Sequence, residues 1–418
     1  MARVAILFDN FGPYHLARLT AAAGACDLLA IEIARRSDEY AWDTAPGQLG
    51  FQSECLFEGT SSKLDAASIA KRLELVFGRF KPEAVVVPGW ASRTSLCSVA
   101  WCLKRRLPLV VMSDSQAKDK LRKGWREAVK RQIVGCFSAA LAGGIPHADY
   151  LAQLGLPRER VFLGYDAVDN SYFAKGAKEV RGQMPEGGGQ GTEDGSQRSV
   201  VRKKHGLPER FFLVSARFIE EKNLPRLLEA YARYRTLCGQ SVVSGPMVPW
   251  SLVVLGDGPL RDSLNSQLSI LNLHGHVQMP GFKQYPDLPV YYELAEALIL
   301  PSVSETWGLV VNEAMASGLP VLVSNRCGCA PDLVQEGVNG FTFDPLDVEQ
   351  LARLMLKMSA FQPFSLSTFG DASRAIISEW GTERFASGLK AAVDKALEVG
   401  PLRPSLLQRT VLTALLWR

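Results

Sequence analysis

Two glutamates stand eight residues apart in the segment Ser304–Pro320, which reads SETWGLVVNEAMASGLP. Between Glu305 and Glu313, Gly308 permits a tight turn at the start of a helix, where unbonded backbone N–H groups point outward. Such a helix start binds phosphate. One carboxylate in the loop and one inside the helix would then reach a sugar hydroxyl and a ribose. The alternative, from the residues alone, is that Glu313 is a solvated helix residue and Glu305 a loop charge.

Two cations form a second candidate site in the segment Val214–Asn223, VSARFIEEKN, where they follow an apolar run. Arg217 offers a planar fork to phosphate, and Lys222 offers a mobile point charge. Beside a leaving diphosphate, both would stabilise the negative charge that develops on it. The alternative is a solvated basic patch at the start of a helix. The motif LGDGP at 255–259 indicates, by itself, a turn.

Short apolar runs that alternate with amphipathic stretches supply the elements that must position these residues. Uninterrupted apolar runs are typical of strands in parallel sheets that are covered on both faces. The sequence predicts strands at 3–8, 28–33, 84–87 and 109–112, with helices at 68–80 and 95–106. It predicts further strands at 211–215, 251–255, 277–279, 297–300 and 320–323, with helices at 224–234, 260–271 and 311–316. This alternation favours right-handed βαβ units and doubly wound α/β domains.

A glycine-rich, charged stretch at 176–204 interrupts this rhythm. It contains seven glycines and almost no large apolar side chain, so it cannot bury enough surface to order itself. We therefore expect an N-terminal domain at 1–170, a flexible linker or insert at 171–205, a C-terminal domain at 206–370 and C-terminal helices at 371–418. In doubly wound sheets ligands bind outside the carboxyl ends of the strands, which predicts a site in a cleft between the two domains.

Four segments occur in a fixed order along the C-terminal half. They are SARFIEEKN, LGDGPLRDSL, MPGF and the long LPSVSETWGLVVNEAMASGLPVLVSNRCGCAPDLVQEGVNGFTFDPLD. Together they resemble the nucleotide-sugar glycosyltransferases of family 4, the glycosyl transferases group 1. The similarity is close over 211–356 and loose in the N-terminal half, where LAGGIPHADYLAQLGLPRERVFLGYDAVDNSYF matches best. The family implies the GT-B fold, an α/β architecture of two doubly wound Rossmann-like domains that face each other across a cleft. It places the acceptor on the N-terminal side, the donor on the C-terminal side, and the C-terminal helices against the N-terminal domain.

The resemblance also implies roles for the charged residues. Arg217 and Lys222 would bind the donor diphosphate, and Glu305 would contact the donor sugar. These three residues would thereby take part in catalysis. Glu313 would hold the ribose of the nucleoside.

Backbone groups complete the donor site that the resemblance implies. Gly308 and Leu309 would give N–H groups to the sugar or the phosphates, next to Trp307 in the same donor-binding segment. Gly12, in DNFGPYH after the first strand, sits where the family brings the backbone close to the phosphates and the acceptor.

The N-terminal half departs from the family at one position. The family often has a histidine after the strand that corresponds to 109–112, whereas this chain reads VVMSDSQ, with Asp114 near that place. Asp114 is therefore a candidate for orienting the sugar hydroxyl or the acceptor, and a turn or helix N-cap residue is the alternative. His15 is a second candidate, with a packed helix residue as the alternative.

The chemistry of the family is retaining transfer of a hexosyl group from a nucleotide-diphosphate sugar to a glycan, lipid-linked or small-molecule hydroxyl. The sugar carbon passes through an oxocarbenium-like state. No side chain can be identified from the sequence as a nucleophile. This favours attack of the acceptor on the front face of the sugar, with the leaving diphosphate as the base. The chain contains no Asp-x-Asp pair, so we expect no metal and no other cofactor. Two alternatives stay open: a nonhydrolysing nucleotide-sugar epimerase of similar fold, and a protein that binds a nucleotide sugar without turnover.

Composition limits the remaining classes. With 47 Lys and Arg against 43 Asp and Glu, the formal charge is only +4, too weak a basic excess for a nucleic-acid partner. No stretch reaches the roughly 20 apolar residues of a membrane helix, and Ala2–Phe8 is too short for the apolar core of a signal peptide. Eight scattered cysteines, with one CxC at Cys327-Gly-Cys329, indicate reduced thiols in a cytoplasmic protein and neither a disulfide framework nor a zinc site.

A basic segment in the N-terminal half indicates a further partner. Lys118–Arg131 carries seven Lys and Arg against two acids, with Leu121, Trp125 and Val129 four apart on one helical face. A basic amphipathic helix of this kind lies on anionic lipid, and would bring the cleft to a lipid-linked acceptor. The apolar, acid-free segment SLLQRTVLTALLWR at 405–418 would either add to this contact or dock on the fold. The alternative is a solvated helix whose apolar stripe packs on the sheet.

Overall fold

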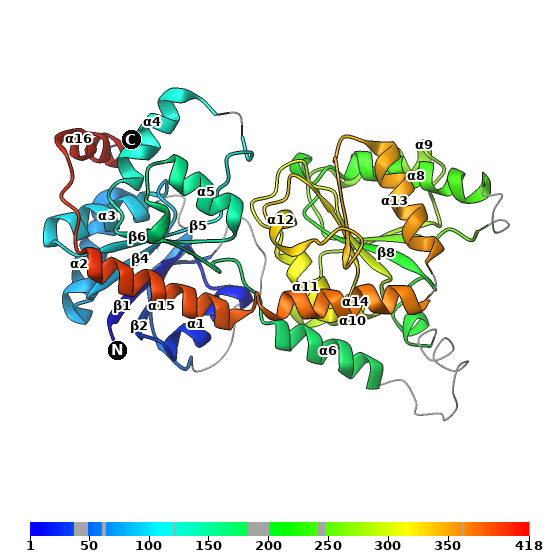
Figure 1. The fold of residues 1–418 in the computed structure, drawn as a ribbon, viewed down its shortest axis with the longest axis horizontal. Helices are drawn as coiled ribbons and strands as arrows, with labels where there is room; N and C mark the ends of the chain where they lie inside the picture. Colours follow the sequence, from blue (N-terminus) through cyan, green and yellow to red (C-terminus); the bar gives the residue numbers. More distant parts are fainter. Residues whose placement is uncertain are drawn as a thin grey trace. The chain divides into compact units, whose positions relative to one another are not determined.

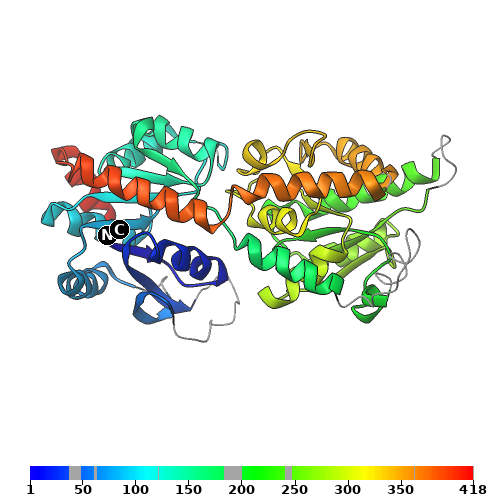
Figure 2. The same cartoon turned by 60° about the horizontal axis from the view of Figure 1, so that its bottom comes forward.

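The structure is a computed structural model that describes residues 1–36, 49–60, 64–120, 122–182, 200–240, 247–361 and 363–417 (Figure 1). The chain forms two compact units: Met1–Asp169 with Trp380–Arg418 is unit 1, and Asn170–Glu379 is unit 2. Each unit has a parallel sheet with helices on both faces (Figures 1 and 2). The predicted class, α/β with two doubly wound sheets, is confirmed.

Unit 1 is built around a seven-stranded sheet in the order β3-β2-β1-β4-β5-β6-β7. Its strands are β1 (Arg3–Phe8), β2 (Asp27–Arg36), β3 (Gln52–Thr60), β4 (Ala84–Pro88), β5 (Leu109–Ser113), β6 (Ala139–Ala142) and β7 (Val161–Leu163). Its helices are α1 (Pro13–Ala23), α2 (Ala66–Phe80), α3 (Arg93–Arg105), α4 (Gly124–Val134), α5 (Ile145–Gln153), α15 (Thr382–Val399) and α16 (Leu406–Leu416). Along β1, Ala5 and Leu7 belong to the core on one face, and Val4 and Ile6 to the core on the other. The uninterrupted apolar run follows from this, because both faces of the sheet are covered.

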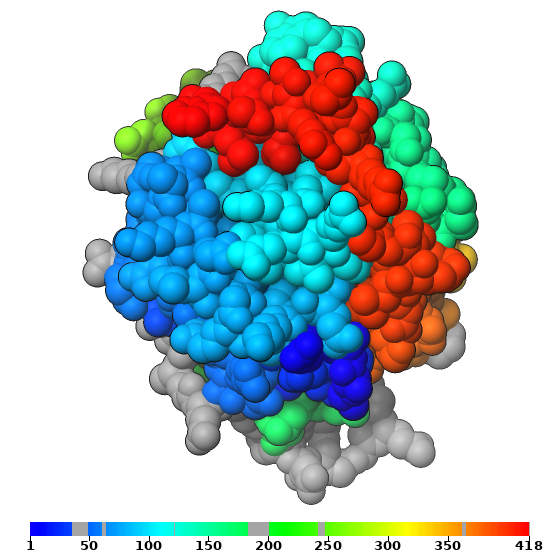
Figure 3. Space-filling view, turned by 90° about the vertical axis from the view of Figure 1, so that its left-hand side faces the viewer, coloured from blue at the N-terminus to red at the C-terminus, as the bar shows by residue number. Residues whose placement is uncertain are grey.

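Two helices from the far end of the chain complete unit 1. α15 packs on α1 and on the strands β6 and β7, and contributes Phe385 and Leu389 to their shared core. The packing is close at Gly388, where a Cβ atom would lie 2.3 Å from the carbonyl oxygen of Leu163 in β7. α16 lies beside α3 and α4 on the other face of the sheet, and is the red helix of Figure 3.

Unit 2 is built around a six-stranded sheet in the order β10-β9-β8-β11-β12-β13. Its strands are β8 (Phe211–Ser215), β9 (Ser251–Leu255), β10 (Val277–Gly281), β11 (Ala297–Leu300), β12 (Val321–Ser324) and β13 (Gly340–Phe343). Its helices are α6 (Asn170–Gly182), α8 (Leu224–Gln240), α9 (Arg261–Ile270), α10 (Leu288–Leu294), α11 (Leu309–Ser317), α12 (Ala330–Leu333), α13 (Val348–Ala360) and α14 (Pro363–Ser378). A short 3₁₀ helix, Glu220–Lys222, follows β8.

Both sheets share one strand order, in which the first strand of the unit lies beside the fourth: β1 beside β4 in unit 1, and β8 beside β11 in unit 2. The chain winds outward in opposite directions from these two strands. At such a switch point the loops that follow the two strands diverge and leave a crevice for a ligand. The fold therefore predicts where in each unit a ligand contacts the protein.

The predicted linker differs from the structure at both of its ends. α6 extends to Gly182 and belongs to unit 2, because Phe173, Ala177 and Val180 are buried at helical spacing. Residues 200–204 are also helical. The rest of the predicted insert, 183–199, lies outside the described residues.

Two further boundaries predicted from the sequence differ from those in the structure. The C-terminal helices predicted as one group at 371–418 are divided, since α14 belongs to unit 2 while α15 and α16 belong to unit 1. The basic helix predicted at 118–131 begins at Gly124, with Lys123 as its N-cap residue. Leu121, part of its predicted apolar stripe, lies outside the described residues. Across the described ranges, no helix combines the length and the apolar character needed to cross a membrane.

Candidate active site

Lys222 and Glu305 meet at the carboxyl ends of the strands of unit 2. Lys222 ends the 3₁₀ helix after β8, Glu305 lies in the loop after β11, and the two strands are neighbours. The Lys222 ammonium group forms an ion pair with the Glu305 carboxylate, which also accepts a hydrogen bond of 3.2 Å from the Ser302 hydroxyl. The two charged side chains are 16% and 14% exposed. The structure thus brings these two predicted site residues together, across the switch point of the sheet.

Asn223 holds Lys222 in this position, although the sequence analysis did not single it out. Its backbone takes the left-handed conformation, with φ of 56°, which asparagine adopts more readily than most residues. Its side-chain amide donates to the carbonyl oxygens of Pro301 (3.1 Å) and Pro345 (2.8 Å). The turn after β8 is thereby tied to the end of β11. An asparagine that closes a polar run after a strand is the signal from which this role could have been predicted.

The loop that carries Glu305 is held on its other side by the segment after β12. The N–H of Gly328 donates to the carbonyl oxygen of Glu305 at 3.1 Å. The N–H of Cys329 donates to the carbonyl oxygen of Trp307 at 3.2 Å. Residues Cys327–Cys329 therefore contribute backbone support to this loop.

Gly308 and Trp307 fix the start of α11. Gly308 has φ of 104°, and a Cβ atom there would lie 2.7 Å from the Leu300 side chain, so glycine is required at this turn. The Trp307 side chain is 1% exposed, and its indole N–H donates to Asn312 Oδ1 at 2.8 Å. The resemblance places Trp307 in the donor-binding segment. In this structure its side chain is buried beneath the turn and stabilises it through the hydrogen bond to Asn312. α11 begins directly after the turn, at Leu309.

Glu313 lies in the interior of unit 2, where its side chain is 1% exposed. The Tyr292 hydroxyl donates to its carboxylate, and the Ser317 hydroxyl donates to its backbone carbonyl oxygen at 3.0 Å. Burial, followed by the negative charge of Glu313, raises the pKa of Tyr292 well above its usual value. Tyr292 therefore stays protonated and acts as a donor. The alternative that Glu313 is a solvated helix residue is wrong.

Arg217 lies on the surface just after β8, in a segment that packs on the turn at 255–259. A Cβ atom at Gly256 would lie 1.9 Å from the carbonyl oxygen of Ala216. A Cβ atom at Gly258 would lie 2.7 Å from that of Phe218. The two glycines thus let one turn approach the backbone around Arg217, a contact that the interpretation of LGDGP as a turn did not include.

Gly12 and His15 belong to one helix start in unit 1. Gly12 is the N-cap residue of α1 and donates its N–H to His15 Nδ1 at 3.2 Å. Burial, with a smaller effect from Arg18, lowers the pKa of His15 to about 3. The ring is therefore neutral near pH 7, and with Nδ1 as an acceptor its hydrogen is on Nε2. His15 can donate a hydrogen bond through Nε2 but cannot take a proton there.

Asp114 follows β5 at the carboxyl end of the unit 1 sheet. The N-cap alternative is wrong, because the next helix, α4, has Lys123 as its N-cap residue. His147, which the sequence analysis did not single out, repeats the arrangement of His15: it is the third residue of α5, and its Nδ1 accepts the N–H of Gly144 at 2.9 Å. The recurrence of GPYH at 12–15 and GIPH at 144–147 is the signal that could have revealed it.

The thiols of Cys327 and Cys329 are buried beside the Glu305 loop. Burial raises the pKa of Cys327 well above its usual value. Within the described ranges, no three His, Cys, Asp or Glu side chains are grouped so as to hold a metal ion. Metal independence stays a prediction that rests on the sequence.

Two doubly wound units, with candidate residues at the switch point of unit 2, define a protein of the GT-B class. HepE from Anabaena, solved in complex with UDP, has this fold with a TM-score of 0.70 and 17% sequence identity, over 94% of this chain and 99% of that one. The lipopolysaccharide outer core galactosyltransferase WaaB has a TM-score of 0.64 and 14% identity, over 94% of this chain and 99% of that one. At these identities the likeness concerns the fold.

Residues 197–365 match the family model described as glycosyl transferases group 1. The resemblance drawn from the sequence is confirmed. A sulfoquinovosyl transferase from Arabidopsis thaliana is 32% identical over 157 residues, which are 37% of this chain and 28% of the relative. An alpha-D-kanosaminyltransferase from Streptomyces kanamyceticus is 28% identical over 203 residues, which are 44% of this chain and 50% of the relative. The chain thus matches these relatives over half of their length or less.

Proposed function

We propose that the chain is a hexosyltransferase that moves a hexosyl group from a nucleotide-diphosphate sugar to a hydroxyl of a glycan, a lipid-linked acceptor or a small molecule. The observation that carries this proposal is the Lys222–Glu305 pair beside the helix start at Gly308, at the switch point of the unit 2 sheet. A diphosphate sugar needs a cation, a carboxylate and a helix start in one place. The family match of unit 2 supports the proposal.

The Lys222–Glu305 ion pair is the resting form of the proposed donor site. When the donor binds, Lys222 and Arg217 would turn to the phosphates, and Glu305 would accept hydrogen bonds from sugar hydroxyls. Because each charged group would exchange one ionic or polar partner for another, neither is left buried without a partner. The N-terminal end of α11 adds a positive partial charge at the same place.

Glu313 and Tyr292 are proposed for the nucleoside end of the donor. A carboxylate accepts several hydrogen bonds, so the bond from Tyr292 does not prevent contact with ribose hydroxyls. Because Glu313 is buried, that contact requires neighbouring side chains to move as the nucleotide enters.

We propose that the transfer retains configuration through front-face attack. The bond from the sugar C1 to the diphosphate oxygen breaks while the acceptor oxygen bonds to C1 on the same side. The acceptor proton passes to the leaving diphosphate, whose charge Lys222 and Arg217 stabilise. His15, with its hydrogen on Nε2, would donate a hydrogen bond in this step, and Asp114 would orient the acceptor.

The test is to incubate the full chain with UDP-glucose and candidate acceptors, and to follow the anomeric protons by NMR. A product, or slowly hydrolysed glucose, that first appears with the configuration of the donor supports retaining transfer. Isomerised nucleotide sugar without transfer would favour the epimerase alternative, and binding without hydrolysis the non-catalytic one. We expect activity to persist in EDTA, and activity lost there and restored by Mg²⁺ or Mn²⁺ would refute metal independence.

We further propose that unit 1 contacts an anionic membrane on its cytoplasmic side, where a lipid-linked acceptor is presented. α4 and α16 pack against each other and expose large apolar side chains. These are Trp125 (60% exposed) from α4, and Leu406 (82%), Leu407 (58%) and Trp417 (88%) from α16 and its end. We call this group and the exposed basic residues Lys118, Lys120, Lys123 and Arg126 the α4–α16 surface. The alternative, in which the stripe packs on the sheet, is wrong for Trp125.

Arg122 does not belong to the α4–α16 surface. Its guanidinium group donates to the carbonyl oxygens of Gln116 and Ala117, and lies 4.5 Å from the ring centroid of Tyr150. Arg122 therefore holds the loop before α4 in place. A test of lipid binding must leave this residue intact.

A further inference from the structure

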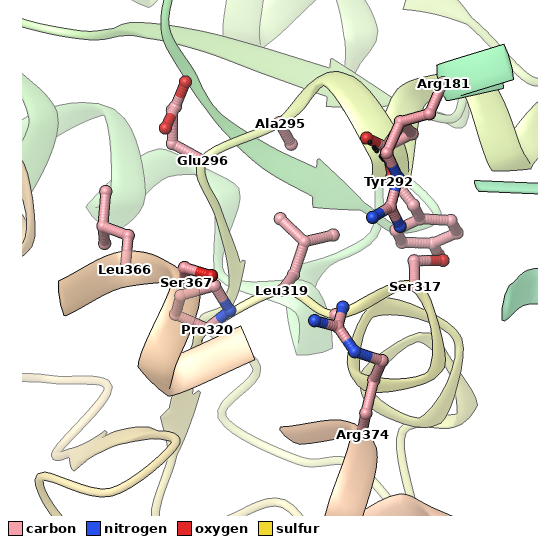
Figure 4. Close-up of a pocket in the computed structure, with 12 residues that line it drawn as sticks. Arg181, Tyr292, Ala295, Glu296, Ser317, Leu319, Pro320, Leu366, Ser367 and Arg374 are labelled. Atoms are coloured by element: carbon pink, nitrogen blue, oxygen red, sulfur yellow. Dashed lines mark ion pairs between the residues drawn. The ribbon is translucent and has the colours of Figure 1, made fainter. Parts of the chain in front are cut away.

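A cavity of about 290 Å³ opens in unit 2 at the amino ends of the strands. Ala295 and Glu296 line it just before β11, and Leu319 and Pro320 line it just before β12 (Figure 4). Glu305 follows the carboxyl end of β11, so the cavity and the Lys222–Glu305 pair lie at opposite ends of this strand. Tyr292, the partner of Glu313, also lines the cavity.

Two arginines point toward each other across this cavity. Arg181 comes from the end of α6 and Arg374 from α14, and Figure 4 shows that their guanidinium groups converge. Each forms an ion pair with a described residue: Arg181 Nε lies 3.0 Å from Glu293, and Arg374 donates to Asp371. Glu293 also lines the cavity, and its carboxylate pairs with the Nε side of Arg181. An anion between the two guanidinium groups would be attracted by both of them.

Glu296 leaves the space between the two arginines open. Its carboxylate lies 3.0 Å from the guanidinium group of Arg202 and 3.5 Å from that of Arg210. Figure 4 shows it turned away from Arg181 and Arg374. The negative charge of Glu296 is therefore paired with Arg202 and Arg210 and not with Arg181 or Arg374.

The backbone after α11 lies close to the Arg374 side chain. Gly318 follows α11 with φ of 87°, and a Cβ atom there would lie 1.5 Å from Arg374 Nη1. At Gly370 on α14, a Cβ atom would lie 2.2 Å from the carbonyl oxygen of Gly318. The guanidinium group thus lies directly against the turn that ends α11.

We propose that this cavity binds a small molecule with a phosphomonoester group that bridges Arg181 and Arg374. Each guanidinium group offers paired N–H donors in a plane, which matches the oxygens of one phosphate. The volume is at the lower limit for small-molecule sites, which fits a hexose phosphate better than a nucleotide sugar. The rest of the ligand would contact the hydroxyl and apolar side chains of the lining, which are Ser317, Ser367, Leu319, Pro320 and Leu366.

The experiment measures binding of inorganic phosphate and of glucose 6-phosphate to the full chain by isothermal titration calorimetry at low salt. We expect both to bind, and glucose 6-phosphate to bind more tightly because its sugar covers the apolar lining. R181Q should weaken both at least about tenfold, the loss expected for a hydrogen bond to a charged group. R374K keeps the charge but loses the planar fork, and should also weaken both. R353Q, an exposed arginine variant on α13, is the matched control.

A separate variant distinguishes this cavity from the proposed donor site. K222A should leave binding of glucose 6-phosphate unchanged, whereas loss of binding in K222A would place the anion at the donor site and overturn the proposal. Absence of binding at millimolar concentrations would overturn it too, as would equal affinity in R181Q and the unchanged chain. Because Arg181 is half exposed at a helix end, R181Q is expected to fold, and its melting temperature checks this.

Discussion

At the scale of single residues, the Lys222–Glu305 ion pair leads to a direct prediction. We expect K222A and E305A each to slow transfer from the nucleotide sugar by about 10²–10³-fold, because each removes a group that meets charge developing in the transition state. The measurement is the turnover rate at saturating donor, together with the melting temperature of each variant.

The matched control for these variants is the exposed ion pair between Glu349 and Arg353 on α13, at 3.9 Å. E349A and R353A remove the same kinds of charge from exposed side chains whose ion pairs, within the described residues, do not include Lys222 or Glu305, and should leave turnover unchanged. Unaltered turnover in folded K222A or E305A would refute the assignment of the donor site.

His15 leads to a prediction about pH. Because its pKa falls from 6.5 to about 3, the unfolded chain binds a proton between these values that the folded chain does not. The free energy of unfolding therefore decreases as the pH falls from about 6.5 toward 3, by at most about 1.4 kcal/mol per pH unit from this residue. H15Q, whose side chain can still accept from the Gly12 N–H, should show a shallower dependence in urea unfolding. Equal slopes for the two proteins would contradict the burial of a neutral ring.

The candidate residues of the proposed donor side could be singled out from the sequence because each stands in a motif beside the end of an apolar run. The pairing of Lys222 with Glu305 could not, because 83 residues separate them and it is the strand order that brings β8 beside β11. The burial of Glu313 could not be predicted from the sequence either, because its partner Tyr292 lies on a different helix, α10. A motif indicates which side chains matter, whereas their partners depend on packing.

At the scale of elements, β1, β8, β9 and β11 have the bounds that the sequence predicts, because their apolar runs are buried on both faces. The end of α6 was missed because glycine and charge dominate the composition of that stretch, while Phe173, Ala177 and Val180 carry the packing. The basic helix was predicted to begin too early because charge density does not distinguish helix from loop. Its first turn is a loop that Arg122 organises.

The α4–α16 surface predicts salt-sensitive binding to anionic vesicles. The combined variant of Lys118, Lys120, Lys123 and Arg126 to glutamine should reduce co-sedimentation with vesicles rich in phosphatidylglycerol, because each basic residue near such a surface contributes about 1 kcal/mol. Binding of the unchanged chain should weaken as salt screens these charges.

A control variant removes the same number of positive charges from another surface of unit 1. It replaces four exposed basic residues in and next to α2, which are Lys71, Arg72, Arg79 and Lys81. Their replacement by glutamine should leave vesicle binding as it was. If no co-sedimentation occurs at low salt, the membrane proposal fails, and an acceptor in solution becomes the better hypothesis.

At the scale of the whole molecule, unit 2 is an insertion within unit 1. The chain leaves unit 1 after Asp169 and returns to it at Trp380. Inside unit 1, Val168 pairs with Gly381, and inside unit 2 the Asn170 side chain donates to the Ile377 carbonyl oxygen at 2.7 Å. The sequence shows the alternation of strands and helices but not this return to unit 1. The helices α14 and α15 follow each other in the chain, yet α14 packs on α11 of unit 2 whereas α15 packs on α1, β6 and β7 of unit 1.

We expect removal of residues 380–418 to unfold unit 1 and to leave unit 2 folded. Phe385, Leu389 and Val393 of α15 are fully buried, and side chains of this kind each contribute about 1.5–3 kcal/mol. Their sum approaches the whole stability of an ordinary domain, about 5–15 kcal/mol. Limited proteolysis with mass spectrometry should find cleavage within 1–169 and protection across the described parts of 170–379.

A shorter truncation that removes residues 404–418 is the control. Of the residues described in this segment, only Leu412 is buried, so both units should keep their protection. Protection of 1–169 after the longer truncation would show that α15 is dispensable.

The insertion also sets an order of events on the ribosome. The sheet of unit 1 emerges first, yet α15 follows only after all of unit 2 has been translated, a delay of roughly 10–40 s at about 5–20 residues per second. Until then the apolar face of β1, β4, β5 and β6 lacks one of its covering helices, and sheets in that state aggregate readily. We therefore expect the nascent chain to depend on chaperones until residue 399 has emerged, and translational pauses within unit 2 to lengthen that dependence.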